Sequence, residues 1–214
     1  MRPRVLCNIA PSLDGKIAPA RKTAPFVMSR HDDDHRLMLS LRARSDAVLI
    51  GASNLRADDP DLMPSKLRVV VTRSGEHIEP TAKMFDTSLG GEAVVAHAGA
   101  MAETKRATLR NCATLVEFGA VEVDVLRLLE WLASERGCKV VVCEGGGVLN
   151  AHLFAARAID ELYVTIVPRI LGGHAAPTMV EGEGFEPDAI PDPRLASVER
   201  VGDELFLVYR FDQR

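Results

Sequence analysis

The stretch between Lys139 and Leu171 constrains the fold more than any other part of the chain. The apolar run 140–143 reads as a buried strand, and Glu144 with three glycines follows it. A helical stretch comes next, and residues 161–167 read as a second strand. A glycine turn between a strand and a helix brings backbone N–H groups toward a phosphate. The stretch therefore indicates an α/β fold and suggests a nucleotide-like ligand.

Strands alternate with helices over most of the remaining chain. The apolar runs predict strands at 5–10, 46–51, 67–72, 93–97 and 114–118. Helices are predicted from an N-cap at Ser29 to about Arg44, at 101–109 and at 121–135, whereas 52–64 reads as a polar segment. The segments 196–201 and 204–212 form an expected closing antiparallel pair with Gly202-Asp203 as its turn. This order predicts one domain over 1–214, an α/β fold with a mostly parallel central sheet, flanking helices and antiparallel C-terminal strands.

The bulk properties exclude several classes of protein. The 214-residue chain has a formal net charge of −4, which argues against a nucleic-acid binder. It has no apolar run near the ~20 residues that a membrane span needs, and its start reads as a strand and not as a signal peptide. The four cysteines form no CxxC pair and read as buried or half-buried residues, which fits a reducing, cytoplasmic setting. The six histidines show no metal-ligand spacing, so no metal is expected.

Several polar residues lie where α/β proteins bind ligands, at the carboxyl ends of predicted strands. Glu144 precedes the triple glycine, although a tight turn and helix-dipole compensation are structural alternatives. Asp58 and Asp59 form an acidic pair that either contacts a ligand or caps a turn. Thr72-Arg73-Ser74 ends a strand and suits a phosphate monoester such as the 2′-phosphate of NADP, with a solvated arginine as the alternative. The turn 12–16, SLDGK, is a weaker signal.

Four segments together resemble the pyrimidine reductase of riboflavin biosynthesis, a family with the dihydrofolate-reductase-like fold. They are SLDGKIA at 12–18, LRARSDAVLIGASNLRADDPDL at 41–62, RVVV at 68–71, and EGGGVLNAHL with IDELYVTIVPRILGG between 144 and 173. They occur in the family's order over nearly the whole chain. The resemblance implies reduction of 5-amino-6-(5-phosphoribosylamino)uracil to its ribitylamino form, with hydride passing from NADPH to C1′ of the opened ribose. It also implies a homodimer.

The resemblance also implies roles for residues at matching positions. Ala10 would lie at the nicotinamide end, and the phosphates would lie against the glycine turn. The implied cofactor-binding residues are Ala10, Asn54, Asp58, Gly145, Gly146, Gly147, Val148 and Leu149, to which the strand-end pattern adds Thr72 and Arg73. The implied substrate-binding residues are Ser29, Arg42, Asp59, Leu62 and Glu144, with Arg42 as the candidate phosphate ligand.

Two positions differ from the family pattern TxxADDPxLxxR. Asn54 stands in place of its threonine and Ser65 in place of its terminal arginine, so that Lys66 is the nearest cation. A dihydrofolate-reductase-like enzyme acting on a pterin or another small molecule is therefore an alternative. A non-catalytic nucleotide-binding protein is a third possibility.

Overall fold

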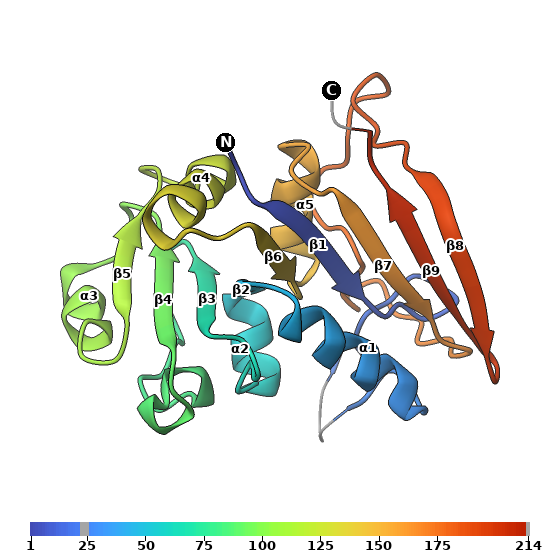
Figure 1. The fold of residues 1–214 in the computed structure, drawn as a ribbon, viewed down its shortest axis with the longest axis horizontal. Helices are drawn as coiled ribbons and strands as arrows, with labels where there is room; N and C mark the ends of the chain where they lie inside the picture. The colour runs from blue at the N-terminus through green and yellow to red at the C-terminus, as the bar shows by residue number, and fades with distance from the viewer. Residues whose placement is uncertain (22–25, 213–214) are drawn as a thin grey trace. The chain divides into compact units, whose positions relative to one another are not determined.

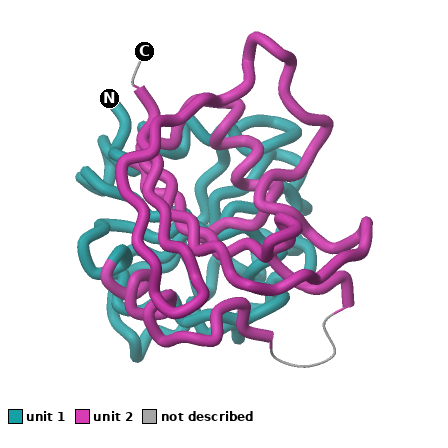
Figure 2. Tube along the Cα trace, turned by 90° about the vertical axis from the view of Figure 1, so that its right-hand side faces the viewer, with its two compact units in different colours: residues 1–4, 41–143 teal, residues 5–40, 144–214 magenta. Residues whose placement is uncertain are grey.

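The structure is a computed structural model that describes residues 1–21 and 26–212. It divides into two compact units, which Figure 2 shows in different colours. Unit 1 comprises residues 1–4 and 41–143, and unit 2 comprises residues 5–40 and 144–214. Each unit contains its own set of paired strands.

Unit 1 contains five parallel strands in the order β5-β4-β3-β2-β6 (Figure 1). Their bounds are β2 Ala47–Gly51, β3 Leu67–Thr72, β4 Glu92–His97, β5 Thr114–Glu117 and β6 Val140–Cys143. The central strands are nearly continuous apolar runs, as strands covered on both faces require. The helices are α2 Ala52–Asp58, α3 Glu103–Leu109 and α4 Val125–Arg136, with short 3₁₀ turns η1 Lys83–Phe85 and η2 Thr87–Leu89.

Unit 2 contains strands in the order β1-β7-β9-β8. β1 (Arg4–Ile9) pairs in parallel with β7 (Glu161–Ile166), whereas β9 (Glu204–Arg210) is antiparallel to both β7 and β8 (Arg194–Val201). α5 (Gly147–Ala155) leads from the glycine turn toward β7, and α1 (Asp32–Ala43) begins in unit 2 and ends in unit 1. The predicted α/β class, with mostly parallel strands and an antiparallel C-terminal pair, is confirmed.

Three predicted helix assignments were wrong. Ser29 is not the N-cap of α1, because the helix begins three residues later, at Asp32, and the Ser29 hydroxyl accepts a hydrogen bond from the His31 N–H ahead of it. The segment 52–64 is not merely polar, because α2 occupies its first seven residues. The helix predicted from 121 begins at Val125 instead, because the Asp124 side chain accepts hydrogen bonds from the N–H groups of Leu126 and Arg127 and caps it there.

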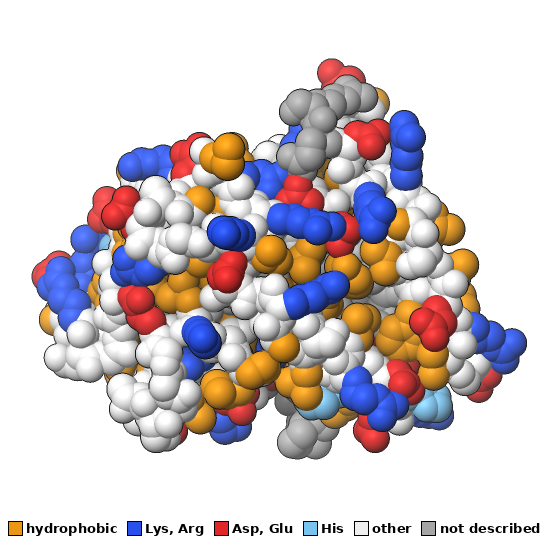
Figure 3. Space-filling view, viewed as in Figure 1, with side chains coloured by type: hydrophobic (Ala, Val, Ile, Leu, Met, Phe, Trp, Pro, Cys, Tyr) orange, Lys and Arg blue, Asp and Glu red, His pale blue; other side chains and the backbone are white. Residues whose placement is uncertain are grey.

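The four cysteines are buried or half-buried, as the sequence predicts. Cys7, Cys138 and Cys143 are buried free thiols and Cys112 is half-buried, as predicted. On the face shown in Figure 3, Lys and Arg side chains are interspersed with Asp and Glu, and no continuous basic area is visible there. Within the described ranges, no helix is long and apolar enough to cross a membrane.

Candidate active site

The glycine turn of unit 2 joins a strand end to a helix start. β6 ends at Cys143, half-buried Glu144 follows, and Gly146 is the N-cap of α5 with extended backbone at φ −77° and ψ 177°. The first N–H groups of an α-helix have no acceptor within the helix, and its N-terminus favours negative charge. The turn therefore offers backbone donors suited to a phosphate group.

Close packing leaves little room for a side chain at two glycines of this turn, Gly145 and Gly147. A Cβ on Gly147 would lie 2.3 Å from Glu181 Cγ and 2.5 Å from the Thr178 carbonyl oxygen, and one on Gly145 would lie 2.9 Å from a Leu149 methyl. The Glu181 carboxylate hydrogen-bonds to Thr178, which lowers its pKa.

The side chains that follow the glycines restrict how this turn can contact a dinucleotide. Val148 is 62% exposed, whereas Leu149 is 6% exposed and packs inward. Leu149 can therefore reach a ligand only through its backbone. A turn of small residues with backbone donors fits a pyrophosphate, so the residues present are compatible with a nicotinamide dinucleotide.

Ala10 lies at the carboxyl end of β1, in the same unit as the glycine turn. It directly follows Ile9, which is in register with Val164 of the neighbouring parallel strand β7. The chain is held beyond this point by a hydrogen bond from the Val167 N–H to the Pro11 carbonyl, 3.0 Å long. Both strands thus end at the same edge.

Ser29 is buried and its hydroxyl is engaged inside unit 2. It donates to the Glu204 carboxylate over 2.8 Å, and the Arg30 N–H donates to the other Glu204 oxygen over 3.2 Å. The His31 N–H donates to the Ser29 hydroxyl, so this serine orders the chain ahead of α1. Glu204 is only 1% exposed and was not among the predicted site residues.

Asp34, in the first turn of α1, is a second carboxylate that the sequence did not single out. Burial raises the pKa of this carboxyl above its ordinary value of 3.8. Nearby Glu204 and Glu144 raise this pKa further, while the Thr165 hydroxyl and His35 lower it. The sequence showed only a run of three first-turn aspartates, the pattern that helix-dipole compensation produces.

The predicted residues of unit 1 follow α2 and the loop after it. α2 starts at the carboxyl end of β2, and the chain then returns to the amino end of β3. Asn54 is half-buried and Asp58 is exposed. Asp59 has left-handed backbone, with φ 42°, and its carboxylate accepts a 2.9 Å hydrogen bond from the Lys83 N–H. Leu62 is fully buried, which makes its side chain part of the core.

Thr72 and Arg73 lie where predicted, at the carboxyl end of β3. Buried Thr72 accepts a 3.0 Å hydrogen bond from the Gly75 N–H, so its hydroxyl shapes the turn. Arg73 is exposed and lies 3.4 Å from Glu122 in a surface ion pair. An exposed pair of this length contributes little to stability and is readily exchanged for a stronger anion.

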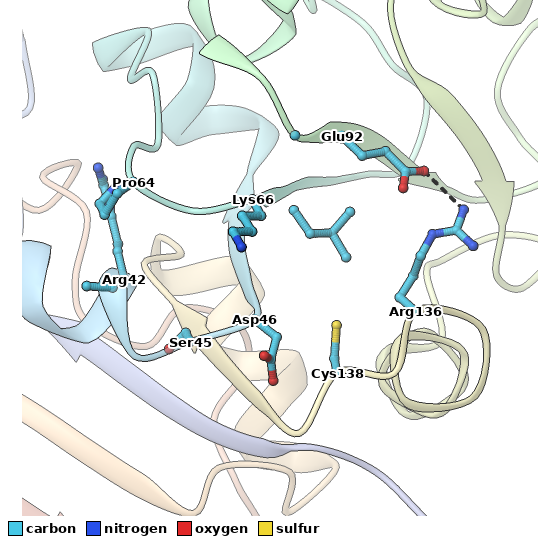
Figure 4. A pocket seen from close by; sticks show the side chains of 11 residues that line it. Arg42, Ser45, Asp46, Pro64, Lys66, Glu92, Arg136 and Cys138 are labelled. Atoms are coloured by element: carbon cyan, nitrogen blue, oxygen red, sulfur yellow. Dashed lines mark hydrogen bonds and ion pairs between the residues drawn. The ribbon is translucent and has the colours of Figure 1, made fainter.

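Arg42 lies at the opposite, amino end of the unit 1 strands. It is 5% exposed and donates a 2.9 Å hydrogen bond to the Met63 carbonyl. A cavity of about 520 Å³ opens beside it, and Figure 4 shows the side chains that line it. Its lining residues are Arg42, Ala43, Ser45, Asp46, Pro64, Lys66, Leu67, Gly91, Glu92, Arg136 and Cys138.

The charged side chains around this cavity include one cation, Lys66, that is available to bind an anion. Asp46 accepts hydrogen bonds from the N–H groups of Lys139 and Val140, and Glu92 pairs with Arg136 at 3.0 Å (Figure 4). The exposed Lys66 side chain also lines the cavity (Figure 4), and its ammonium makes no hydrogen bond or ion pair with the described residues. The carboxylates are thus committed, whereas Lys66 can bind an anion.

The comparisons with known proteins agree with this architecture. Residues 3–207 match the family model described as the RibD C-terminal domain. The chain is 31% identical over 229 residues to an Archaeoglobus fulgidus protein named 2,5-diamino-6-ribosylamino-4(3H)-pyrimidinone 5′-phosphate reductase, with 100% of both chains covered.

Two solved structures are similar in fold. The Acinetobacter baumannii RibD structure, form 2, has a TM-score of 0.77 and 20% identity, and the match covers 99% of this chain but 58% of that one. Dihydrofolate reductase from Enterococcus faecalis has a TM-score of 0.55 at 12% identity, with 98% and 97% covered. These likenesses show the dihydrofolate-reductase-like fold predicted from the sequence.

Proposed function

The chain belongs to the RibD C-terminal domain family, the pyrimidine reductases of riboflavin biosynthesis, and we propose that it reduces 5-amino-6-(5-phosphoribosylamino)uracil with NADPH. The observation that carries this proposal is the family match, which extends over residues 3–207. The product is the ribitylamino pyrimidine. Such a reaction depends on the placement of two reactants and requires no protein nucleophile.

The dinucleotide, when bound, supplies a hydride to the substrate carbon. In unit 2, the N-terminal turn of α5 would hold its pyrophosphate through the backbone of residues 145–149, with Ala10 beside the nicotinamide. In unit 1, Asn54, Asp58 and Thr72 would provide polar contacts. Exposed Arg73 would bind the 2′-phosphate that distinguishes NADPH from NADH. On binding, Arg73 would leave its weak surface ion pair with Glu122 and pair with the doubly charged phosphate.

In each unit, taken by itself, several residues have the chemistry for a substrate contact. Glu144 would contact the pyrimidine from unit 2, and Ser29 would act through the buried contact it makes with Glu204. Asp59 and the backbone of Leu62 would contribute from unit 1. Arg42, which the resemblance implies as the phosphate ligand, and exposed Lys66 would supply positive charge for the 5′-phosphate.

A spectrophotometric assay of NADPH oxidation tests the reaction. The purified protein should oxidise NADPH only when the phosphorylated pyrimidine is present, which is followed as loss of absorbance with product identified by mass spectrometry. Activity with dihydrofolate and none with the pyrimidine would support the pterin reductase instead. NADPH binding in calorimetry without turnover of any substrate would support a non-catalytic nucleotide-binding protein.

A second candidate substrate has its own support. The relative from Archaeoglobus fulgidus, similar over its full length, is named for a 2,5-diamino-pyrimidinone 5′-phosphate, which keeps an amino group where the uracil has a carbonyl. The two pyrimidines should therefore be compared by kcat/KM in the same assay. A site that forms a hydrogen bond with the amino group strongly rejects the carbonyl, and the reverse also holds. One of the two pyrimidines should therefore be clearly preferred.

Lys66 provides the test of the phosphate position. Lys66→Ala should raise KM for the phosphorylated pyrimidine roughly 10- to 150-fold, because a charge-assisted contact contributes ~1.5–3 kcal/mol. Affinity for NADPH, measured by calorimetry, should not change. The dephosphorylated pyrimidine supplies the control, since wild type and variant should use it equally poorly. An equal loss with both compounds would place the phosphate elsewhere.

Gly146 tests the pyrophosphate position. Gly146→Val should raise the Kd for NADPH, because a branched side chain at the N-cap would crowd the phosphates. Ala151→Val adds the same kind of bulk further along α5 and should leave the Kd unchanged. Equal NADPH affinity in wild type and Gly146→Val would mean that the turn is structural.

A homodimer is part of the same proposal. β8 is the outer strand of unit 2, and its Leu195 and Val198 are 54% and 58% exposed. An exposed outer strand with apolar side chains tends to pair with another chain. Phe206 and Leu207 on β9, which the sequence offered as a hint, are half-buried. The proposed dimer contact is therefore centred on β8.

A further inference from the structure

The cavity beside Lys66 lies at the amino ends of the unit 1 strands, opposite the carboxyl ends where the dinucleotide contacts of this unit are proposed. All of its lining residues belong to unit 1. Its volume, about 520 Å³, is in the range of sites that bind small organic molecules. The cavity is therefore large enough for a ligand of its own.

The charged side chains of the cavity carry a local excess of positive charge. Three of them are cations, Arg42, Lys66 and Arg136, and two are carboxylates, Asp46 and Glu92. The whole chain, in contrast, has a formal net charge of −4. A concave surface lined by an excess of one charge attracts ligands of the opposite charge, so this cavity favours an anion.

Lys66 has a fixed backbone and an ammonium that is open to a ligand. Its carbonyl oxygen accepts a 2.7 Å hydrogen bond from the Glu92 N–H. A Cβ on Gly91 would overlap the same oxygen, and the φ of Gly91 is 72°, so this close approach requires glycine. Because the ammonium makes no hydrogen bond or ion pair with the described residues, an anion can bind it without displacing a partner.

Arg136 lies on the opposite side of the cavity from Lys66 (Figure 4). Its guanidinium donates to the Glu92 carboxylate at 3.0 Å and to the Glu135 carbonyl at 3.2 Å. It also stacks on Trp131, with 4.4 Å between the guanidinium carbon and the ring centre. A guanidinium has five N–H donors, so donors remain for a ligand beyond these bonds with the described residues. The stacking holds them in place.

The remaining lining includes an apolar, uncharged surface. Leu67, only 6% exposed, lines the cavity together with Pro64 and Cys138. Burial, and then the charge of Asp46, raises the pKa of the Cys138 thiol to about 11, so this thiol stays protonated at neutral pH. A protonated thiol packs as a small apolar group. The cavity thus combines two cations with a surface that suits an apolar body.

We propose that this cavity is a second ligand site, which binds a small organic phosphate, a phosphate group attached to an apolar body. The phosphate would contact the Lys66 ammonium and the remaining donors of Arg136. The body would pack against Leu67 and Pro64. A phosphate suits the site better than a carboxylate, because a doubly charged group gains more from two cations. The binding itself does not rest on the proposed function.

Calorimetry with phenyl phosphate tests the site on the whole protein. Its Kd should be at least tenfold lower than that of inorganic phosphate, because the ring buries apolar surface. Benzoate should bind more weakly than phenyl phosphate, and phenol should not bind. The fluorescence of Trp131, the one tryptophan of the chain, should change in the same titration, since the ligand contacts the arginine stacked on it. Absence of phenyl phosphate binding, or tighter binding of benzoate, would overturn the proposal.

Two matched variants locate the bound probe. Arg136→Met should raise the Kd for phenyl phosphate roughly tenfold or more, because a charge-assisted contact is lost. Arg110→Met removes an arginine from another ion pair of unit 1, with Glu103 at 2.6 Å, and should leave the Kd unchanged. Undiminished binding by Arg136→Met would place the probe outside the cavity and overturn the site. An equal loss in both variants would show a general effect of charge and overturn it too.

A second pair of variants decides if Arg136→Met does not fold. Ala43 is exposed at the end of α1 and lines the cavity, so Ala43→Glu should weaken phenyl phosphate binding through repulsion. Ala107→Glu makes the same change at an exposed position of α3 and should have no effect. Wild-type affinity in Ala43→Glu would equally overturn the site.

Lys66 connects this site with the reaction, and this consequence alone rests on the proposed function. Lys66 is proposed to supply charge for the 5′-phosphate of the substrate, so a ligand in the cavity would compete for it. Phenyl phosphate should raise KM for the phosphorylated pyrimidine without changing kcat, and Arg136→Met should relieve this inhibition. Inhibition that persists in Arg136→Met would overturn the cavity as its origin. Calorimetric binding by a protein that turns over no pyrimidine would overturn the proposed function and support the site.

Discussion

Asp14 shows how one exposed side chain joins distant parts of unit 2. Its carboxylate accepts hydrogen bonds from the Ser12 hydroxyl at 2.6 Å, the Leu171 N–H at 3.0 Å and the Gly172 N–H at 2.7 Å. The Ser12 bond and then the two backbone donors lower the pKa of Asp14 from 3.8 to about 2. The charged form is thus the one that holds the turn after β1 against the segment after β7.

The effect of this aspartate on stability should depend on pH. Because its pKa is lower in the folded state, Asp14 stabilises the protein fully above the unfolded pKa of 3.8, and this contribution is lost as the pH falls toward 2. Asp14→Asn should therefore melt at a lower temperature than wild type at pH 7. The difference should shrink between pH 4 and pH 2 in thermal scans.

Asp188→Asn is a suitable control, because this aspartate is exposed and lies in the loop between β7 and β8. Its melting temperature should equal that of the wild type at every pH. A difference for Asp14→Asn that stays constant down to the lowest pH would show that shape, and not charge, holds the turn.

At the residue scale, the sequence could locate candidates but not their partners. It identified the glycine turn and the segment SLDGK, yet Asp14 binds residues 157 and 158 positions away, which no local pattern reveals. Asp34 looked like an ordinary first-turn aspartate for the same reason. Its raised pKa comes from burial and from Glu204 and Glu144, on other parts of the chain.

At the element scale, strand β3 contains a buried charge that organises a loop. Arg68 is 2% exposed, and its guanidinium donates to the carbonyl oxygens of Met84 at 2.8 Å and Gly90 at 2.7 Å. Burial lowers its pKa, and the charge of Asp86 opposes this. The arginine thus supplies hydrogen-bond donors to backbone carbonyl groups of the segment that contains η1 and η2.

Arg68→Met should destabilise the protein, because it keeps the apolar stem and leaves two inward-facing carbonyls without donors. The free energy of unfolding should fall by about 2–3 kcal/mol in urea denaturation, in line with charge-assisted hydrogen bonds. Arg73→Met, at the exposed end of the same strand, should change it by less than about 0.5 kcal/mol. Equal effects of the two substitutions would contradict this role of Arg68.

Elements were predicted well wherever their signal was local and apolar. β3 has the predicted bounds 67–72, and β2, β4, β5 and β6 lie within one residue of theirs. α2 was missed because its sequence, ASNLRAD, is polar and short, and its packing against the sheet rests on buried Leu55. Tertiary contact, which a single sequence does not display, decides such a helix.

At the scale of the whole molecule, the outer strand of unit 2 is the surface to test. Among the described strands, β8 pairs with β9 alone, and a register shift between Leu195 and Ser197 interrupts this pairing. Seven of its eight residues are exposed. A register shift and charged side chains discourage nonspecific pairing at such an edge. We therefore expect β8 to bind a specific partner, a second copy of this chain.

Light scattering coupled to gel filtration should therefore give about 47 kDa, twice the 23.3 kDa of one chain. Val198→Glu should shift the species toward 23.3 kDa, because a buried unpaired carboxylate at the contact is costly. Val121→Glu makes the same change at a 67% exposed position of unit 1 and should leave the dimer intact. A wild-type monomer at micromolar concentration, or dissociation by Val121→Glu alone, would remove β8 as the contact.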